Sequence, residues 1–451
     1  MMEKELPEGW LKTTFDQVAE ATDFVANGSF EALRLNVTQS SSPDYAILLR
    51  LKDHSNAWNG PFSYVTKDSY EFLQKSSLKA GDLFIANVGA PGRLFLVPEL
   101  GMPMTIGPNG LRVRSYSVTS NKFLSYYYKS FFGKEEIDNI VTGTAQLKFN
   151  KTGLRATNVL LPPLAEQKRI VAKLDMSFGY LETLKASLAR IPELLKTFRQ
   201  SVLTQAVTGK LTGNFETTLL GDMGVNIQTG PFGSSLHKED YIENGTPVIN
   251  PSHIKNGEIL PDRSISISDS KLKEVKSFIL SDGDVIIGRR GEMGRAAVYS
   301  DIFGVMLCGT GSIILKKSPN LSSQFLAYYL RSPFCVDFLT TNAVGSTMVN
   351  LNQKIIKSLP FPKLGKKEQE TIVKKIEELL SKADAIESQY LLLKEKIDKL
   401  PQALLAKAFR GELVPQDPAD EPAAVLLEQI QNEIGKLSKK GKKQMELVFE
   451  D

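Results

Sequence analysis

Short polar loops rich in arginine recur in the two halves of this chain. The segment "GRRGEMGR" carries Arg289, Arg290 and Arg295, and the earlier segment "GAPGR" carries Arg93. Arginine side chains donate hydrogen bonds to base edges in the major groove of DNA and pair with phosphates. The chemistry that these loops could do is therefore the binding of a polyanion.

A second polar segment follows each of these loops. "TGTAQLKFNK" and its counterpart "GSTMVNLNQK" supply amide and lysine side chains, which can also contact bases or phosphates. The candidate residues are Gln146, Lys148, Asn150, Lys151, Asn350, Asn352 and Lys354. For any single residue the alternative is ordinary turn chemistry with solvated charge. Recurrence in both halves favours a function for the group.

Catalytic motifs are not recognisable in the sequence. His54, His237 and His253 do not have the spacing of metal ligands. In "VTGKLTG", Thr204 stands where a phosphate-binding loop needs its first glycine. "NPSH", which begins at Asn250, lacks the second proline and the aromatic residue of a segment that stacks a flipped base. Since no carboxylate and lysine cluster marks a nuclease either, we expect a binding protein.

The sequence segments that must position the polar loops occur twice in the chain. Gly81-Asp82 and Gly283-Asp284 are 202 residues apart, and the same offset relates Glu166-Gln167 to Glu368-Gln369. It also relates "AVTGKL" to "AFRGEL". A repeat of this length indicates duplicated domains. Upstream of each Gly-Asp the halves diverge, so we expect matched parts to share a geometric role and divergent parts to have different targets.

Each half contains a long run of apolar residues at steps of three and four, which is typical of a coiled-coil seam. The predicted seam is Ile170, Leu174, Leu181, Leu184 and Leu188 in the first copy and Ile372, Ile376, Leu379, Ile386 and Leu393 in the second. Pro192 and Pro401 predict a kink or a restart, and Gly209 and Gly411 predict the ends. We expect the two runs to pack antiparallel; the alternative is that each docks on its own domain.

The globular parts are predicted to be mixed α/β, with short strands in "DLFIANVG" and "DVIIGRRG" and helices in "NKFLSYYYKSFF" and "SSQFLAYYLRSPF". The predicted division is a first domain at 1–160, a helical segment at 161–212, a second domain at 213–362, a helical segment at 363–413 and a tail at 414–451. The tail carries a short helix and a basic end, and we expect it to be mobile.

Bulk composition sets the class of protein. The chain has 451 residues, 42% of them hydrophobic, and a net charge of +4. Cys308 and Cys335 cannot form a disulfide framework, and no apolar run is long enough for a membrane span. The start, "MMEKELPEGW", lacks the apolar stretch of a signal peptide. The sequence therefore predicts a soluble protein of the reducing cytoplasm.

Particular motifs accompany the two helical runs. "LPPLAEQ" and "LPFPKLGKKEQ" lead into them, "QSVLTQAVTGKL" and "LPQALLAKAFRGELVPQ" end them, and "PEGW" stands near the start. This combination resembles the specificity subunits of type I restriction–modification systems, from Leu6 to about Lys440. "GPFGSSLHKEDY" is similar to the start of a target-recognition domain in that family, which adds Ser234, His237 and Lys238 as candidate DNA contacts. The first half departs here, with "NGSFEALRLN".

The resemblance implies an α+β chain in which two target-recognition domains are separated by two long helices forming an antiparallel coiled coil, with a pseudo-two-fold internal repeat. Each domain would read one half of a split, asymmetric sequence in double-stranded DNA. Two methyltransferase subunits would carry S-adenosylmethionine and methylate adenine, and restriction subunits would use ATP and Mg²⁺. This chain would hold no cofactor and no catalytic residue. A self-contained methyltransferase or nuclease, and a coiled-coil adaptor without nucleic-acid binding, remain open.

Overall fold

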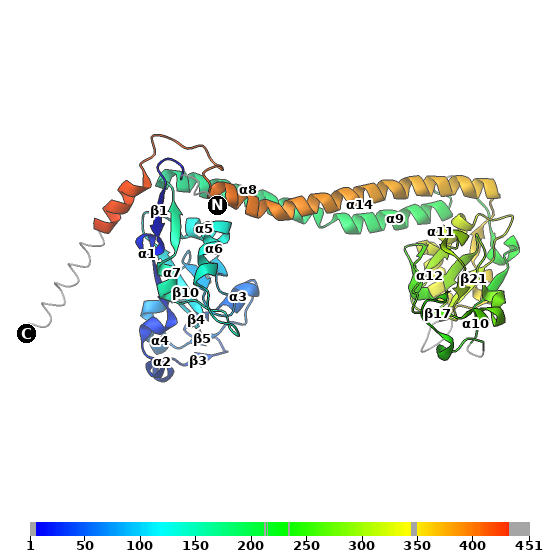
Figure 1. Ribbon diagram of the computed structural model, residues 1–451, viewed down its shortest axis with the longest axis horizontal. Helices are drawn as coiled ribbons and strands as arrows, with labels where there is room; N and C mark the ends of the chain where they lie inside the picture. Colours follow the sequence, from blue (N-terminus) through cyan, green and yellow to red (C-terminus); the bar gives the residue numbers. More distant parts are fainter. Residues whose placement is uncertain (1–5, 212, 214, 233–234, 344–349, 433–451) are drawn as a thin grey trace, which may run out of the picture. The chain divides into compact units, whose positions relative to one another are not determined.

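The computed structural model describes residues 6–211, 213, 215–232, 235–343 and 350–432 (Figure 1). The chain divides into two compact units. The first holds the chain up to Ala186 and again from Lys394, and the second holds Ser187–Leu393. Each unit therefore contains one globular domain and parts of the long helices.

The first unit has eleven strands in its described residues. They are β1 Leu11–Thr14, β2 Ala19–Asp23, β3 Gln39–Ser40, β4 Ala46–Leu49, β5 Tyr64–Val65, β6 Ser77–Leu78, β7 Leu83–Ala86, β8 Leu94–Leu96, β9 Met104–Ile106, β10 Gly110–Ser115 and β11 Asn158–Leu161. The α-helices are α1 Phe15–Val18, α2 Phe30–Asn36, α3 Leu51–Ser55, α4 Lys67–Phe72, α5 Asn121–Lys129, α6 Phe131–Ile140, α7 Lys151–Arg155 and most of α8 Leu164–Leu188.

The second unit repeats the order of strands and α-helices from β7 onward and differs from the first unit before that point. Its strands are β12 Thr217–Leu219, β13 Ile227–Thr229, β14 Thr246–Ile249, β15 Ile254–Lys255, β16 Glu258–Ile259, β17 Ser266–Ile267, β18 Val285–Gly288, β19 Ala296–Val298, β20 Leu307–Cys308, β21 Ser312–Leu315 and β22 Pro360–Pro362. Its α-helices are α9 Ile191–Val207, α10 Asp269–Glu274, α11 Ser323–Arg331, α12 Pro333–Asn342, α13 Gln353–Lys357 and the larger part of α14 Lys366–Ala408.

The central sheets of the two domains have the same topology. The strand order is β2-β10-β7-β8 in the first domain and β13-β21-β18-β19 in the second, with antiparallel neighbours throughout. The register also repeats, because Val113 pairs with Leu83 and Leu315 pairs with Val285. The repeat that the sequence predicts is thus a repeat of paired strands.

Each central sheet is buried on both faces, because successive side chains of a strand point to opposite sides. In β7, Leu83 and Ile85 belong to the core that contains α5, whereas Phe84 and Ala86 belong to a second core with β4 and β9. In the second domain α11 packs on β18 and β19 in the same way. Strands covered on both faces read as continuous apolar runs, which is why "DLFIA" and "DVIIG" do not alternate.

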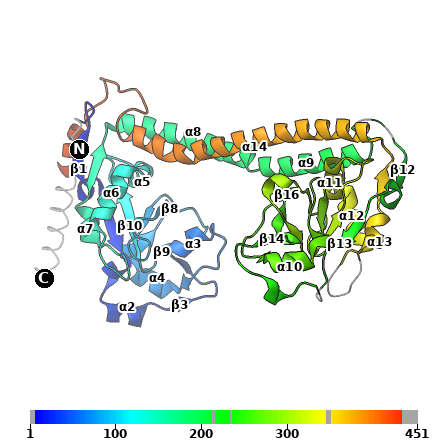
Figure 2. The same ribbon diagram turned by 45° about the vertical axis from the view of Figure 1, so that its right-hand side comes forward.

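The long helices pair antiparallel within each unit (Figure 2). In the first unit Ile170 and Leu174 of α8 share a buried cluster with Leu405 of α14. In the second unit Val202 of α9 shares one with Ile372 and Ile376, at the other end of α14. Both clusters also contain the core of the neighbouring domain, so the coiled-coil pairing and the docking of each helix on its own domain occur together.

The predicted seam is buried only towards its ends. Leu181 is buried, and Leu188 and Leu379 are partly buried. Leu184, Ile386 and Leu393 are 48%, 49% and 46% exposed. The expectation that these three leucine and isoleucine side chains lie in a closed seam is corrected: the spacing of apolar residues marks a face of a helix but does not say that this chain covers it.

The two prolines have different effects on the helices. Pro192 lies in the first turn of α9, which begins after a break at the end of α8, as the sequence predicts. α14 instead continues through Pro401 without a restart. The predicted ends hold: α9 stops at Val207 before Gly209, and α14 stops at Ala408 before Gly411, with both glycines at positive φ.

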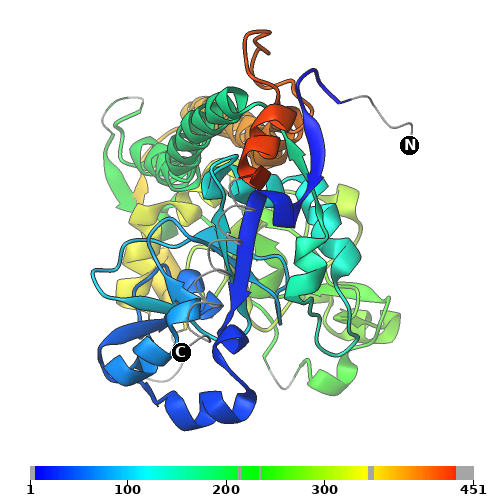
Figure 3. The same ribbon diagram turned by 90° about the vertical axis from the view of Figure 1, so that its left-hand side faces the viewer.

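The described part of the tail is not free. Residues 423–432 form a helix that packs on the first domain (Figure 3). Its Ala423, Leu427 and Ile430 are buried in the same cluster as Trp10. Ala423 N donates to Gly9 O at 3.0 Å. This corrects the expectation of a mobile helix, and residues 433–451 lie outside the described chain. In the described residues no helix is long and apolar enough to cross a membrane.

Candidate nucleic-acid interface

In the second domain the structure brings the two predicted polar loops together. Arg290 and Asn350 form an antiparallel backbone bridge, and Leu351 N donates to Arg289 O at 2.9 Å. Arg289 N in turn donates to Gly311 O at 2.9 Å, which ties the loop to the residue just before β21. The loop after β18 is therefore held between two other segments of the same domain.

The first domain builds the same frame. Val88 and Lys148 form the backbone bridge, Phe149 N donates to Asn87 O at 3.0 Å, and Asn87 N donates to Asn109 O at 3.2 Å. Each of these residues lies 202 positions before its counterpart in the second domain. The frame is thus shared, while the side chains on it differ: Asn87 and Val88 replace two arginines.

A glycine lets each loop lie close to the second of the helices that follow the central sheet. Gly92 and Gly294 have φ of 83° and 81°. A Cβ on Gly92 would stand 2.8 Å from Ile137 of α6, and one on Gly294 would stand 2.3 Å from Val336 of α12. Since a positive φ and a close approach both favour glycine, "GAPGR" and "GRRGEMGR" share this residue for a structural reason.

The three arginines of the second loop have different surroundings. Arg290 is exposed, and its Nε donates to Asn350 Oδ1 at 2.8 Å. Arg295 donates from Nε and Nη2 to Glu292 Oε2 at 3.0 and 2.7 Å and from Nη1 to Pro251 O at 3.3 Å. Arg289 is partly buried, and burial and the neighbouring Arg290 cation lower the pKa of its guanidinium.

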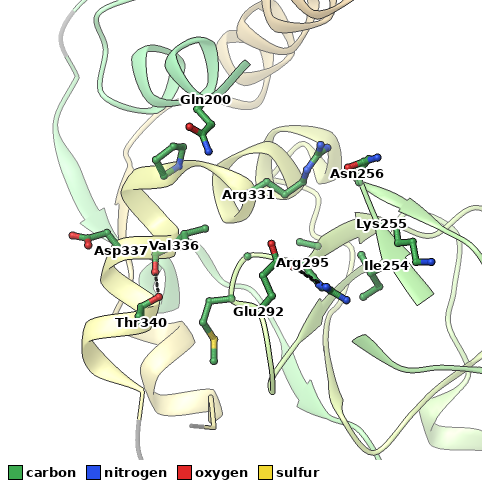
Figure 4. A pocket seen from close by; sticks show the side chains of 15 residues that line it. Gln200, Ile254, Lys255, Asn256, Glu292, Arg295, Arg331, Val336, Asp337 and Thr340 are labelled. Carbon is green, nitrogen blue, oxygen red and sulfur yellow. Dashed lines mark hydrogen bonds and ion pairs between the residues drawn. The ribbon is translucent and has the colours of Figure 1, made fainter. Parts of the chain in front are cut away.

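A cavity of about 890 Å³ adjoins this loop within the second domain (Figure 4). Arg295, Lys255 and Arg331 line it together with Glu292 and Asp337. Figure 4 shows Arg295 turned towards Glu292, with the Arg331 side chain extending towards Asn256. Both signs of charge meet here, so the cavity is not a simple anion site.

In the first domain the predicted residues are spread along the exposed loops. Arg93, Gln146 and Lys148 are exposed. Lys151 is partly buried, and its Nζ pairs with Asp23 Oδ1 at 3.2 Å. Burial lowers the pKa of His54, and the Arg93 and Lys129 cations lower it further. The loop therefore presents positive charge near His54.

Two of the predicted residues cap helices. Asn150 Oδ1 accepts from Gly153 N at 2.7 Å at the start of α7, and Asn352 Oδ1 accepts from Ile355 N at 3.0 Å at the start of α13. Asparagine is among the preferred N-caps, so these carbonyl oxygens have a structural partner. This explains their recurrence without a contact to DNA.

The remaining candidates lie on the surface. Lys354 is exposed, as are His237 and Lys238, where His237 caps a short 3₁₀ turn. Ser234 lies outside the described residues. No group of three His, Cys, Asp or Glu side chains that could hold a metal ion is present in the described part of the chain.

Sequence reasoning missed Phe232. Its ring lies 5.8 Å from the guanidinium carbon of Arg289. The two residues are far apart in the chain, and the local signal, "GPFG", indicates a turn rather than a partner. The sequence does identify the first-domain counterpart of Arg289, because the offset of 202 residues relates it to Asn87.

The fold and the loops define a class of protein: two duplicated α/β domains with differently equipped polar loops, joined through paired helices. A family model described as "Type I restriction modification DNA specificity domain" matches residues 27–193 and 213–394. The chain therefore belongs to the type I restriction–modification specificity family. It is a DNA sequence-specificity subunit with two recognition domains, and this subunit of the system is not the catalytic one.

Individual proteins agree with this assignment. The chain is 27% identical to the type I restriction enzyme EcoBI specificity subunit of Escherichia coli, over 94% of this chain and 92% of that protein. It is 29% identical to the StySPI specificity subunit of Salmonella potsdam, over 95% of this chain and 96% of that protein. The crystal structure of the HsdS subunit from Thermoanaerobacter tengcongensis has a similar fold, with a TM-score of 0.62, 19% identity, and coverage of 91% and 99%.

Proposed function

We propose that this chain reads a two-part, asymmetric target in double-stranded DNA and assembles the enzyme that modifies it. Each domain contacts one half-site through the loops after β7 and α6 or after β18 and α12. The observation that carries the proposal is the duplicated loop frame with unlike side chains. A shared frame gives both domains the same way of approaching a duplex, and unlike side chains give them different base preferences.

We further propose that the chain scaffolds two methyltransferase subunits and, where present, restriction subunits. S-adenosylmethionine belongs to the methyltransferase subunits, and ATP and Mg²⁺ belong to the restriction subunits, so this chain holds none of them. The support is the family, whose members include specificity subunits of type I restriction enzymes. We place the complex in the cytoplasm, in keeping with two free, buried cysteines.

The exposed apolar face of α8 supports a docking role. Met176, Tyr180 and Leu184 are exposed and follow one another at intervals of four residues, so they line one side of the helix. A contiguous apolar stripe on a helix that already has a partner is typical of a binding surface. We assign this stripe to a methyltransferase subunit.

A methylation assay tests the reading of DNA. The chain is reconstituted with its methyltransferase subunit and S-adenosylmethionine and given duplexes in which every position is randomised in turn. We expect two blocks of required bases separated by an unread gap, with half-sites about 10 base pairs apart, since one face of the duplex recurs at that interval. Methyl transfer by the purified chain alone would instead support a self-contained enzyme.

A co-purification assay tests the docking surface. Tyr180→Glu places a charge in the stripe and is expected to reduce recovery of the methyltransferase subunit at least ten-fold. Glu182→Ala is the matched control, because Glu182 is exposed on another side of the same helix. Equal recovery with both variants would exclude this face of α8 as the docking surface.

A further inference from the structure

The three arginines of the loop after β18 are not equally available to a ligand. Arg290 donates from Nε to Asn350, and Arg295 is held by the Glu292 carboxylate and the Pro251 carbonyl. For Arg295, a contact to DNA would have to replace a charge-assisted pair. Arg295 therefore stabilises the conformation of the loop.

Arg289 differs from both neighbours. Its backbone is fixed on two sides, because its N donates to Gly311 O and its O accepts from Leu351 N. No described residue forms a hydrogen bond or an ion pair with its guanidinium, and Nε is buried without a partner. The backbone of Arg289 is fixed, and a partly buried guanidinium without a hydrogen-bond acceptor is costly to the folded domain, so we infer that a ligand supplies the acceptor.

Phe232 restricts the orientation of this guanidinium. Its ring centroid is 5.8 Å from Arg289 Cζ, although the phenylalanine itself is 62% exposed. An aromatic ring attracts a cation over its face and covers one side of the planar group. The Nη donors remain at the edge of that plane, where they can form two parallel hydrogen bonds.

We propose that Arg289, oriented by Phe232, reads a guanine in the second half-site by donating to its O6 and N7 atoms. Arginine in this bidentate geometry is the commonest specific contact to guanine. The inference rests on the proposed function and narrows the base contact of this loop to one of its three arginines. Phe232 acts as a positioning residue.

The contact belongs to the second half-site alone. The equivalent residue in the first domain is Asn87, whose Nδ2 donates to Phe149 O at 3.3 Å. The Oδ1 atom of Asn87 is buried and has no hydrogen-bond partner among the described residues, so this short amide faces the interior of the domain and not its surface. The same frame thus carries a long guanidinium in the second domain and a short, inward-facing amide in the first.

The test uses the reconstituted methyltransferase complex and duplexes in which each base pair of the target is replaced in turn. We expect Arg289→Ala to lose about ten-fold or more of the discrimination at one G·C pair of the second half-site, with the first half-site unaffected. Replacing that guanine by 7-deazaguanine removes N7. It is expected to weaken binding by the native complex but not by the Arg289→Ala complex.

Phe232→Ala is expected to reduce discrimination at the same base pair and at no other. Phe303→Ala is the matched control, because Phe303 is also 62% exposed in this domain but belongs to the 3₁₀ turn Asp301–Phe303, outside the loop after β18. A uniform loss of affinity with a salt slope reduced by about one would show that Arg289 contacts phosphate, and would overturn the inference. So would unchanged discrimination in Arg289→Ala. If the native complex itself shows no base preference, the proposed function fails as well.

Discussion

Gln167 and Gln369 explain why the Glu-Gln motif is written twice. Gln167 Nε2 donates to Val118 O and Pro162 O at 3.0 and 2.9 Å, and its Oε1 accepts from Thr119 Oγ1 at 2.7 Å. In the second unit Gln369 Nε2 donates to Leu364 O at 2.9 Å and to Asn320 O at 3.5 Å, the counterparts of Pro162 and Val118, while its Oε1 accepts from the backbone N of Ser322 at 2.9 Å. Each glutamine therefore ties the first turn of a long helix to its own domain, which gives the domain a defined attachment to the helix.

Gln369→Leu is expected to destabilise the second unit. Gln369 is fully buried, and its loss leaves Ser322 N and Leu364 O without partners. Each unsatisfied group costs about 1–3 kcal/mol of unfolding free energy. Denaturant unfolding followed by hydrogen exchange in α11 measures the effect, with exposed Gln205→Leu as the control. Equal stability of the two variants would contradict the tying role.

Glu166, beside Gln167, predicts a pH dependence. It is 1% exposed, Trp10 Nε1 donates to its Oε2 at 3.0 Å, and its Oε1 has no hydrogen-bond partner among the described residues. Burial raises the pKa of this carboxyl, against the Trp10 hydrogen bond and the Arg169 cation. The folded state then holds the proton more tightly than the unfolded state, so unfolding free energy falls as pH rises from the ordinary glutamate pKa through the raised one.

Glu166→Gln keeps an acceptor for Trp10 and removes the ionisation. We expect this variant to lose that fall in unfolding free energy and to be at least as stable as the native chain at neutral pH. Glu368→Gln is the matched control, since Glu368 is the repeat counterpart and is exposed. The same pH profile for both variants in thermal unfolding would exclude Glu166 as the cause.

Residue types predicted the site only in part. Arg289 and Arg290 were recognised as polar candidates, and the structure gives them a common frame with Asn350. Asn150 and Asn352 were indistinguishable from base-reading amides, because capping a helix and reading adenine use the same side-chain atoms. Phe232 was missed since its partner is distant in the chain.

At the scale of elements, the C-terminal helix closes the first unit. Arg169 of α8 pairs with Asp420 at 2.6 Å, and Leu427 and Ile430 pack in the cluster of Trp10. The sequence of this helix predicted its existence but not its partner, because its apolar face is short and a linker precedes it. The local periodicity of apolar residues does not indicate which distant strands a helix packs against.

Leu427→Ala is expected to lower the unfolding free energy of the first unit by about 2–5 kcal/mol, the usual cost of a core leucine truncation. Val425→Ala is the matched control, because Val425 lies on the same helix and is exposed. Protease sensitivity of β1 and of the tail measures the loss. Equal sensitivity of the two variants would show that the helix is dispensable to the unit.

The periodicity of apolar residues predicted the long helices correctly, but it did not predict which parts of their apolar faces are buried. Ile170, Leu174, Ile372 and Ile376 are buried as the seam requires, and the 202-residue offset placed them correctly in both copies. Leu184 continues the same rhythm and yet is exposed. An apolar stripe predicts that some surface covers it, and we propose that a methyltransferase subunit covers this one.

At the scale of the whole molecule, the helices are expected to set the gap between half-sites. Seven residues inserted both between Ala186 and Ser187 and between Leu393 and Lys394 preserve the heptad and lengthen both helices at the boundary of the two units. The added ~10 Å corresponds to about three base pairs. We expect the methylated target to gain a gap longer by that amount; an unchanged gap would exclude the helices as the spacer.

Mapping modified adenines across the genome tests the central claim most directly. Cells that carry the methyltransferase subunit are compared with and without this chain, and all methylated adenines are sequenced. The account predicts one asymmetric sequence motif in two parts with a fixed unread gap, present only when this chain is expressed. A single uninterrupted motif, or the same methylation without the chain, would contradict it.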